Sequence, residues 1–126
     1  MVQQLTIAYE CINSIGNSLE LEEMLEDIIS TFVRRTGAIG GKYIGPDPLD
    51  SQHQVHIGRD FEIPLQLTQD IEAFEIHSVG HSLKILDIFI HDGNFLFAFK
   101  EQNNLVLLGN MFVNFRTKIT NAIEAC

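Results

Sequence analysis

Histidine and acidic side chains are the residues of this chain whose chemistry could bind or transform a ligand. His77 and His81 are four residues apart, a spacing that places two imidazoles on one face of a helix as metal ligands. Gly80 lies between them and disfavours a helix there. No acid or cysteine completes the set at a recognisable spacing. We therefore expect no metal site and interpret the histidines as loop and strand-end residues.

Asp87 is the sharpest single candidate because its carboxylate interrupts an apolar run between Leu86 and Ile88. An acid in the middle of a strand either faces water, pairs with Lys100 diagonally across a hairpin, or lines a ligand pocket. The third alternative defines a candidate ligand-binding face, because side chains two residues apart share one side of a strand. The candidate ligand-binding residues are Ile85, Asp87 and Phe89.

No catalytic constellation accompanies these residues. No serine, histidine and acid lie in a recognisable motif, and no paired carboxylates lie on one recognisable loop. Gly40 and Gly41 lack the P-loop pattern, so we expect them in a flat strand that packs against a helix. Cys11 and Cys126 do not make a disulfide framework. We therefore expect a protein that is not an enzyme, and the sequence does not identify a cofactor.

Length and charge exclude several classes of partner. The chain has 126 residues, which predicts a single domain over residues 1–126. Eight basic and 17 acidic residues give a net charge of −9, and only Arg34 and Arg35 are adjacent bases. Nucleic acid and anionic membranes are poor partners for such a surface. No apolar run approaches the ~20 residues of a membrane span, and no signal-peptide core is visible, so we expect a cytoplasmic protein.

Apolar periodicity predicts helices at both ends and strands in the middle. The final stretch has a continuous stripe at alternating spacings of three and four residues: Leu105, Leu108, Phe112, Phe115, Ile119 and Ala122. Residues 59–81 are the hardest to interpret, with a helix predicted from a Thr68 cap to Gly80. The other helices are expected over residues 2–16 and 20–36, and strands over 38–44 and 52–58.

Residues 83–100 contain the clearest hairpin signal. Asp92-Gly93 is a favoured two-residue turn, and it would place His91 opposite Asn94. Counting outward pairs Ile90 with Phe95, Ile88 with Phe97, and Leu86 with Phe99. These large apolar side chains share the face that we expect to pack on helices. The other face carries Ile85, Asp87, Phe89, Leu96, Ala98 and Lys100.

This order of elements resembles the GAF domain. Four segments carry the resemblance. Leu19 to Ile29 is an acidic segment before a leucine-rich stripe, and Thr36 to Gly41 is similar to the family's helix-to-strand junction. Asp92-Gly93-Asn94 precedes an apolar strand, and Asn121 to Ala125 resembles the usual end of the last helix. The resemblance implies an α+β fold, in which a six-element antiparallel sheet is flanked by helices and the N- and C-terminal helices pack on one face. Residues 59–81 are short for the pocket-covering helices of that family.

The resemblance also implies a function. It indicates a regulatory domain that senses a small molecule within a larger signal-transduction protein, such as a two-component system, with a covalently linked output domain. The alternative is a ligand-free dimerisation and relay module. Apolar residues outside the final stripe favour a homodimer built from the terminal helices. The residues expected at that dimer interface are Leu5, Ile12, Val106 and Val113.

Overall fold

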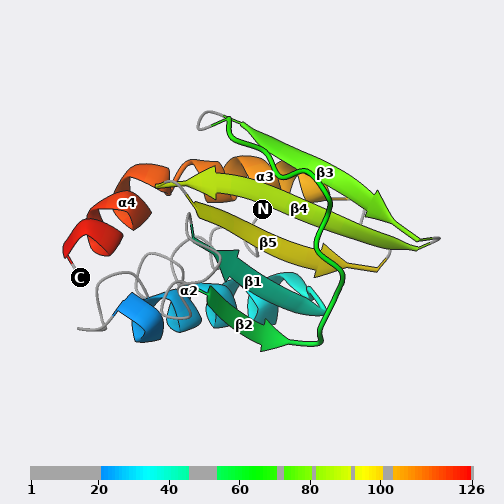
Figure 1. Ribbon diagram of the computed structural model, residues 1–126, viewed down its shortest axis with the longest axis horizontal. Coiled ribbons are helices and arrows are strands. Elements are labelled where there is room, and N and C mark those ends of the chain that lie inside the picture. Colours follow the sequence, from blue (N-terminus) through cyan, green and yellow to red (C-terminus); the bar gives the residue numbers. More distant parts are fainter. Residues whose placement is uncertain are drawn as a thin grey trace.

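The computed structural model describes residues 21–45, 54–70, 73–80, 82–91, 93–100 and 104–125. Within these ranges the chain has an α+β fold, in which three helices cover one face of a five-stranded antiparallel sheet (Figure 1). The strand order is β2-β1-β5-β4-β3. The elements are α2 (Leu21–Thr36), β1 (Gly40–Ile44), β2 (Gln54–Gly58), β3 (Phe74–Val79), β4 (Leu83–Ile90), β5 (Gly93–Phe99), α3 (Leu105–Val113) and α4 (Arg116–Ala125).

Helix α2 confirms the helix that was predicted over residues 20–36. Its apolar stripe is almost completely removed from water and consists of Met24, Leu25, Ile28, Ile29 and Phe32. Gly37 ends the helix with a φ of 78°, a left-handed conformation that glycine adopts without steric cost. The Gly37 N–H donates to the carbonyl oxygen of Val33 at 3.1 Å, which satisfies one of the last helical carbonyls.

Strand β1 is an interior strand of the sheet, since it pairs with β2 on one side and β5 on the other. Gly41 lets this strand approach α2 closely. A Cβ atom at Gly41 would lie 2.5 Å from Cγ2 of Ile29 and 3.1 Å from Cγ2 of Val33. Gly41 is therefore a site of strand-to-helix packing, as predicted from the sequence, whereas a Cβ atom at Gly40 would meet the backbone of Arg59. Strand β2 pairs back on β1 as expected.

The β4–β5 hairpin has the predicted faces but not the predicted pairs. Leu86 lies opposite Phe97 and Ile88 opposite Phe95, so the ladder is shifted by two residues from the sequence-based register. The turn begins at His91, whose φ of 52° is left-handed, and Gly93 already belongs to β5. A two-residue shift preserves the side of every side chain, since strand side chains alternate with a period of two. The large apolar face therefore does pack on the helices.

The C-terminal stripe forms two helices instead of the single predicted helix. Helix α3 ends at Val113, Asn114 and Phe115 form a turn in which the Phe115 N–H donates to the carbonyl oxygen of Phe112, and the chain resumes as α4. The stripe itself is confirmed: Leu105, Leu108, Phe112 and Ile119 are buried, and Phe115 and Ala122 pack against the same core. The predicted helix over residues 2–16 lies outside the described residues.

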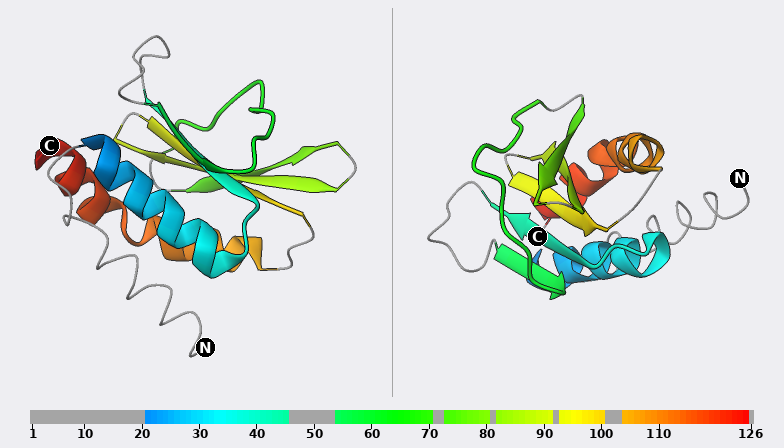
Figure 2. Two further views of the ribbon diagram at one scale, coloured as in Figure 1. Left: turned by 90° about the horizontal axis from the view of Figure 1, so that it is seen from below. Right: turned by 90° about the vertical axis from the view of Figure 1, so that its right-hand side faces the viewer.

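Residues 59–80 contain no helix in their described part, so the predicted helix from Thr68 to Gly80 is wrong. Its second half is instead the edge strand β3, antiparallel to β4. The preceding segment, residues 59–70, crosses the sheet on the face opposite to the helices (Figure 2, left). Phe74 fixes β3 against the helical layer, since its ring lies directly over Gly109 of α3.

Two apolar clusters lie on the two sides of the sheet. The larger one lies between sheet and helices, where Phe97 packs against Phe32 with ring centroids 4.3 Å apart and against Phe112 at 5.3 Å. The smaller cluster lies under residues 59–70 and contains Phe61, Ile85, Leu96 and Ala98. Among the described residues, no helix is long and apolar enough to cross a membrane.

Candidate functional site: a buried carboxylate beside an open hollow

Residues 59–70 are fixed to the sheet at two points, and the first is Lys42 of β1. Its ammonium donates to the carbonyl oxygen of Phe61 at 3.0 Å and forms an ion pair with Oδ1 of Asp60 at 2.6 Å. The same nitrogen lies 4.8 Å from the centre of the Phe61 ring, within cation–π range. The hydrogen bond and charge of Lys42 lower the pKa of the Asp60 carboxyl group.

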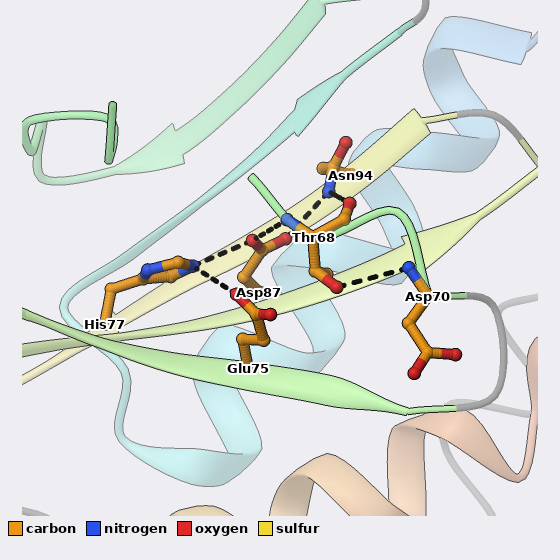
Figure 3. A network of polar contacts seen from close by, with 6 residues as sticks. All are labelled: Thr68, Asp70, Glu75, His77, Asp87 and Asn94. Atoms are coloured by element: carbon orange, nitrogen blue, oxygen red, sulfur yellow. Dashed lines mark hydrogen bonds and ion pairs between the residues drawn. The ribbon is translucent and has the colours of Figure 1, made fainter. Parts of the chain in front are cut away.

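The second attachment point is Asp87, whose side chain is completely buried in the middle of β4. Its Oδ2 accepts a hydrogen bond from the backbone N–H of Thr68 at 2.8 Å. Its Oδ1 accepts one from Nδ2 of Asn94, also at 2.8 Å, and the same nitrogen donates to the Thr68 carbonyl oxygen (Figure 3). Both backbone groups of Thr68 are therefore bound by side chains of the sheet.

His77 of β3 joins this network from the neighbouring strand. Its Nε2 lies 2.9 Å from Oδ2 of Asp87 and 3.7 Å from Oε2 of Glu75 (Figure 3). A carboxylate can only accept, so Nε2 is the donor in the shorter contact. Strand geometry explains the cluster: Glu75 is directly opposite Asp87 in the antiparallel ladder, and His77 is two residues further along the same face.

An open hollow lies between this network and residues 62–70. Its polar side chains include the carboxylates of Glu62, Asp70 and Glu75, and no lysine or arginine occurs among the described residues that line it. Apolar side chains contribute as well, and Leu65 at its border is fully exposed to water. The hollow therefore offers a ligand both negative charge and apolar surface.

The three ligand-binding candidates from the sequence lie on this side of the sheet, but in different environments. Phe89 is half-buried and lines the hollow, whereas Ile85 is fully buried in the smaller apolar cluster. Asp87 itself does not line the hollow, but its hydrogen-bond partners His77, Thr68 and Asn94 do. From the sequence, His77 was considered only together with His81, and Thr68 only as a helix cap; Asn94 and Glu75 were not identified as site residues.

Two of the three alternatives for Asp87 are excluded by the structure. The side chain does not face water, because it has no exposed surface. It does not pair with Lys100, because the observed register places Leu96 opposite Asp87. Lys100 lies four residues beyond Leu96 and is exposed, too far along the strand for a diagonal contact.

The four residues expected at a dimer interface do not share one environment. Leu5 and Ile12 lie outside the described residues. Val113 is only 8% exposed and packs in the larger apolar cluster of its own subunit. Val106 is 60% exposed and its neighbour Leu107 is 44% exposed, so these two side chains make the apolar surface of α3.

The sequence matches no known family model and no curated protein, so any functional assignment rests on the geometry described above.

Proposed function

We propose that this chain is a regulatory domain that senses a small molecule bound in the hollow between β3 and residues 62–70. The observation that supports it best is the buried Asp87 network, which fixes Thr68 beside an open, acidic hollow. As the GAF resemblance implies, the domain would act within a larger signal-transduction protein and control a covalently linked output domain. It would be a binding domain without catalytic activity of its own, located in the cytoplasm.

The lining of the hollow defines the class of ligand. The carboxylates of Glu62 and Glu75 favour a cationic group or several hydrogen-bond donors. Leu65 is fully exposed and Ile63 is 42% exposed, so an apolar portion of a ligand would gain from covering them. The ligand class is therefore a small organic cation, such as an amine, with an apolar body.

The network also offers a route from the hollow to the helices. Asn94 holds Thr68 at the hollow, and its neighbour Phe95 packs on the opposite face of β5. The Phe95 ring lies 5.2 Å from that of Phe112 in α3. A ligand that moves Thr68 would thus alter the position of β5 relative to α3, which is the step that a relay of signal requires.

Native mass spectrometry of the purified chain, followed by thermal denaturation with a panel of small amines, tests this proposal. We expect a retained molecule, or an amine that raises the melting temperature. Glu75→Gln should weaken that stabilisation, because it removes a carboxylate of the hollow. Glu26→Gln, an exposed glutamate of α2 in the helical layer, is the matched control and should leave it unchanged. Equal responses of both variants would contradict binding in the hollow.

The alternative function, a ligand-free dimerisation and relay module, is favoured by a different observation. Val106 and Leu107 are adjacent, apolar and exposed on α3. Removal of such side chains from water would stabilise a homodimer. The two functions are compatible, because residues 62–70, which line the hollow, and helix α3 lie on opposite faces of the sheet (Figure 2).

A further inference from the structure

We propose that Glu75, His77 and Asp87 form a binding site for a divalent transition-metal ion of the Zn²⁺ type. One ligand atom from each of these side chains lies within 4.8 Å of the other two. This inference goes beyond the proposed sensing of an organic molecule, because the three side chains come from two adjacent strands and would bind a metal ion, although Glu75 and His77 also line the hollow. It also differs from the expectation drawn from the sequence, in which His77 had no acidic partner.

The distances between the ligand atoms suit one shared ion. Metal–ligand bonds of about 2.0–2.1 Å place neighbouring ligand atoms about 2.9 Å apart in octahedral geometry and about 3.4 Å apart in tetrahedral geometry. Nε2 of His77 is 2.9 Å from Oδ2 of Asp87 and 3.7 Å from Oε2 of Glu75. Only small side-chain rotations would therefore bring all three atoms around one ion.

The donor set selects the class of metal. One imidazole nitrogen and two carboxylate oxygens suit Zn²⁺, Co²⁺, Fe²⁺ or Mn²⁺, whereas Mg²⁺ and Ca²⁺ prefer oxygen ligands alone. The two carboxylates also balance the charge of a divalent ion. The Glu75 side chain is 56% exposed, so the site opens to solvent on one side. Water or an oxygen of a ligand in the hollow would complete the coordination shell.

The surroundings of Asp87 hold its carboxylate in the orientation that a metal ligand needs. Asn94 binds Oδ1, and the Thr68 N–H occupies one lone pair of Oδ2. The second lone pair of Oδ2 now accepts from His77 and would be given to the ion. Metal binding replaces the proton on Nε2 of His77, which moves to Nδ1 when the ring is neutral or to solvent when the ring is charged.

Titration of the complete 126-residue chain with Co²⁺, followed by its visible absorption, tests the site. We expect d–d bands that saturate at one Co²⁺ per chain and that disappear when Zn²⁺ is added. His77→Gln and Glu75→Gln should each weaken Co²⁺ binding by at least about tenfold. His56→Gln is the matched control, because His56 is an exposed strand histidine in β2, and it should leave the affinity unchanged.

Unchanged Co²⁺ affinity in both site variants would overturn the proposal. A sulfur-to-cobalt charge-transfer band would overturn it as well, because it would assign the ion to Cys11 or Cys126. Glu75→Gln keeps the test valid if His77→Gln does not fold, because Glu75 is exposed. The amine titration described above is made without metal. Failure of the metal site is therefore distinguishable from failure of ligand sensing.

Discussion

The side-chain nitrogen of Asn94 lies 2.8 Å from Oδ1 of Asp87. Both side chains are buried, and their contact joins the central strand β5 to β4. The same nitrogen reaches the carbonyl oxygen of Thr68, while Oδ2 of Asp87 accepts the Thr68 N–H. Asp87 is therefore an acceptor at both oxygen atoms. Its burial is stabilised by these donors, since a buried carboxylate without partners would be costly.

Asp87→Asn should lower the free energy of unfolding by about 1–3 kcal/mol, because one buried donor loses its acceptor. In either orientation of the new amide, its nitrogen faces a donor, either Asn94 Nδ2 or the Thr68 N–H. Urea denaturation measures the loss. Glu62→Gln, at an exposed position of the same segment, is the control and should change stability by less than about 0.5 kcal/mol. A similarly small effect of Asp87→Asn would contradict the hydrogen-bond assignment.

Phe97→Ala should cost about 3–5 kcal/mol, because it empties the centre of the larger apolar cluster. Phe97 is fully buried between Phe32 and Phe112. Phe89→Ala, on the opposite face of the hairpin, should cost clearly less because its side chain is only half-buried. Chemical denaturation of both variants provides the comparison. Equal losses would be inconsistent with the two faces of the hairpin as described.

The faces of the elements could be predicted from the sequence because they depend only on local periodicity. The stripe of α2 and the apolar side of β4 and β5 were both identified in this way. The register of the hairpin depends on which two residues form the turn. In the sequence, both His91-Asp92 and Asp92-Gly93 are candidate two-residue turns. Both leave the same residues facing the helices, so the hydrophobic pattern could not distinguish them.

The candidate site could be predicted only in part, because its members come from segments far apart in the chain. Asp87 stood out as a lone acid in an apolar strand. Its partners Thr68 and Asn94 are 19 and 7 residues away, and no spacing rule connects them. His77 was interpreted as a loop or strand-end residue, and His81 was the only partner considered for it. The available signal was the alternation of apolar Phe74 and Ile76 with polar Glu75 and His77, which predicts a strand with both polar residues on one face.

His91→Gly should raise the free energy of unfolding by up to about 1 kcal/mol, because the left-handed conformation is sterically unfavourable for a residue with a Cβ atom and not for glycine. His91 has a φ of 52° at the start of the β4–β5 turn. The substitution also removes a 3.6 Å contact between Nδ1 and Oε1 of Glu124, but exposed pairs of this kind contribute little. Glu124→Gln measures that loss separately. A His91→Gly variant that is less stable than Glu124→Gln would contradict the argument.

Lys42→Met should raise the pKa of Asp60 towards its ordinary value, because Lys42 is the principal cause of the lowered pKa. A carboxyl group whose pKa is lower in the folded state stabilises the fold above its unfolded pKa. That contribution is lost as the pH falls through the lowered pKa. NMR titration of the side-chain carboxyl carbons measures the shift, and the Glu62 resonance in the same spectra is the control. An Asp60 pKa that is unchanged in Lys42→Met would exclude the ion pair.

Self-association through α3 is the last prediction. Val106 and Leu107 are exposed apolar neighbours, so we expect sedimentation equilibrium at micromolar concentration to report a dimer mass. The double variant Val106→Glu, Leu107→Glu should be monomeric with an unchanged circular dichroism spectrum. Val113→Glu is the contrasting variant: it places a charge in the subunit's own core and should unfold the chain, because Val113 is only 8% exposed. A monomer for the unmodified chain, or a dimer that survives the double substitution, would show that these two side chains do not form the interface.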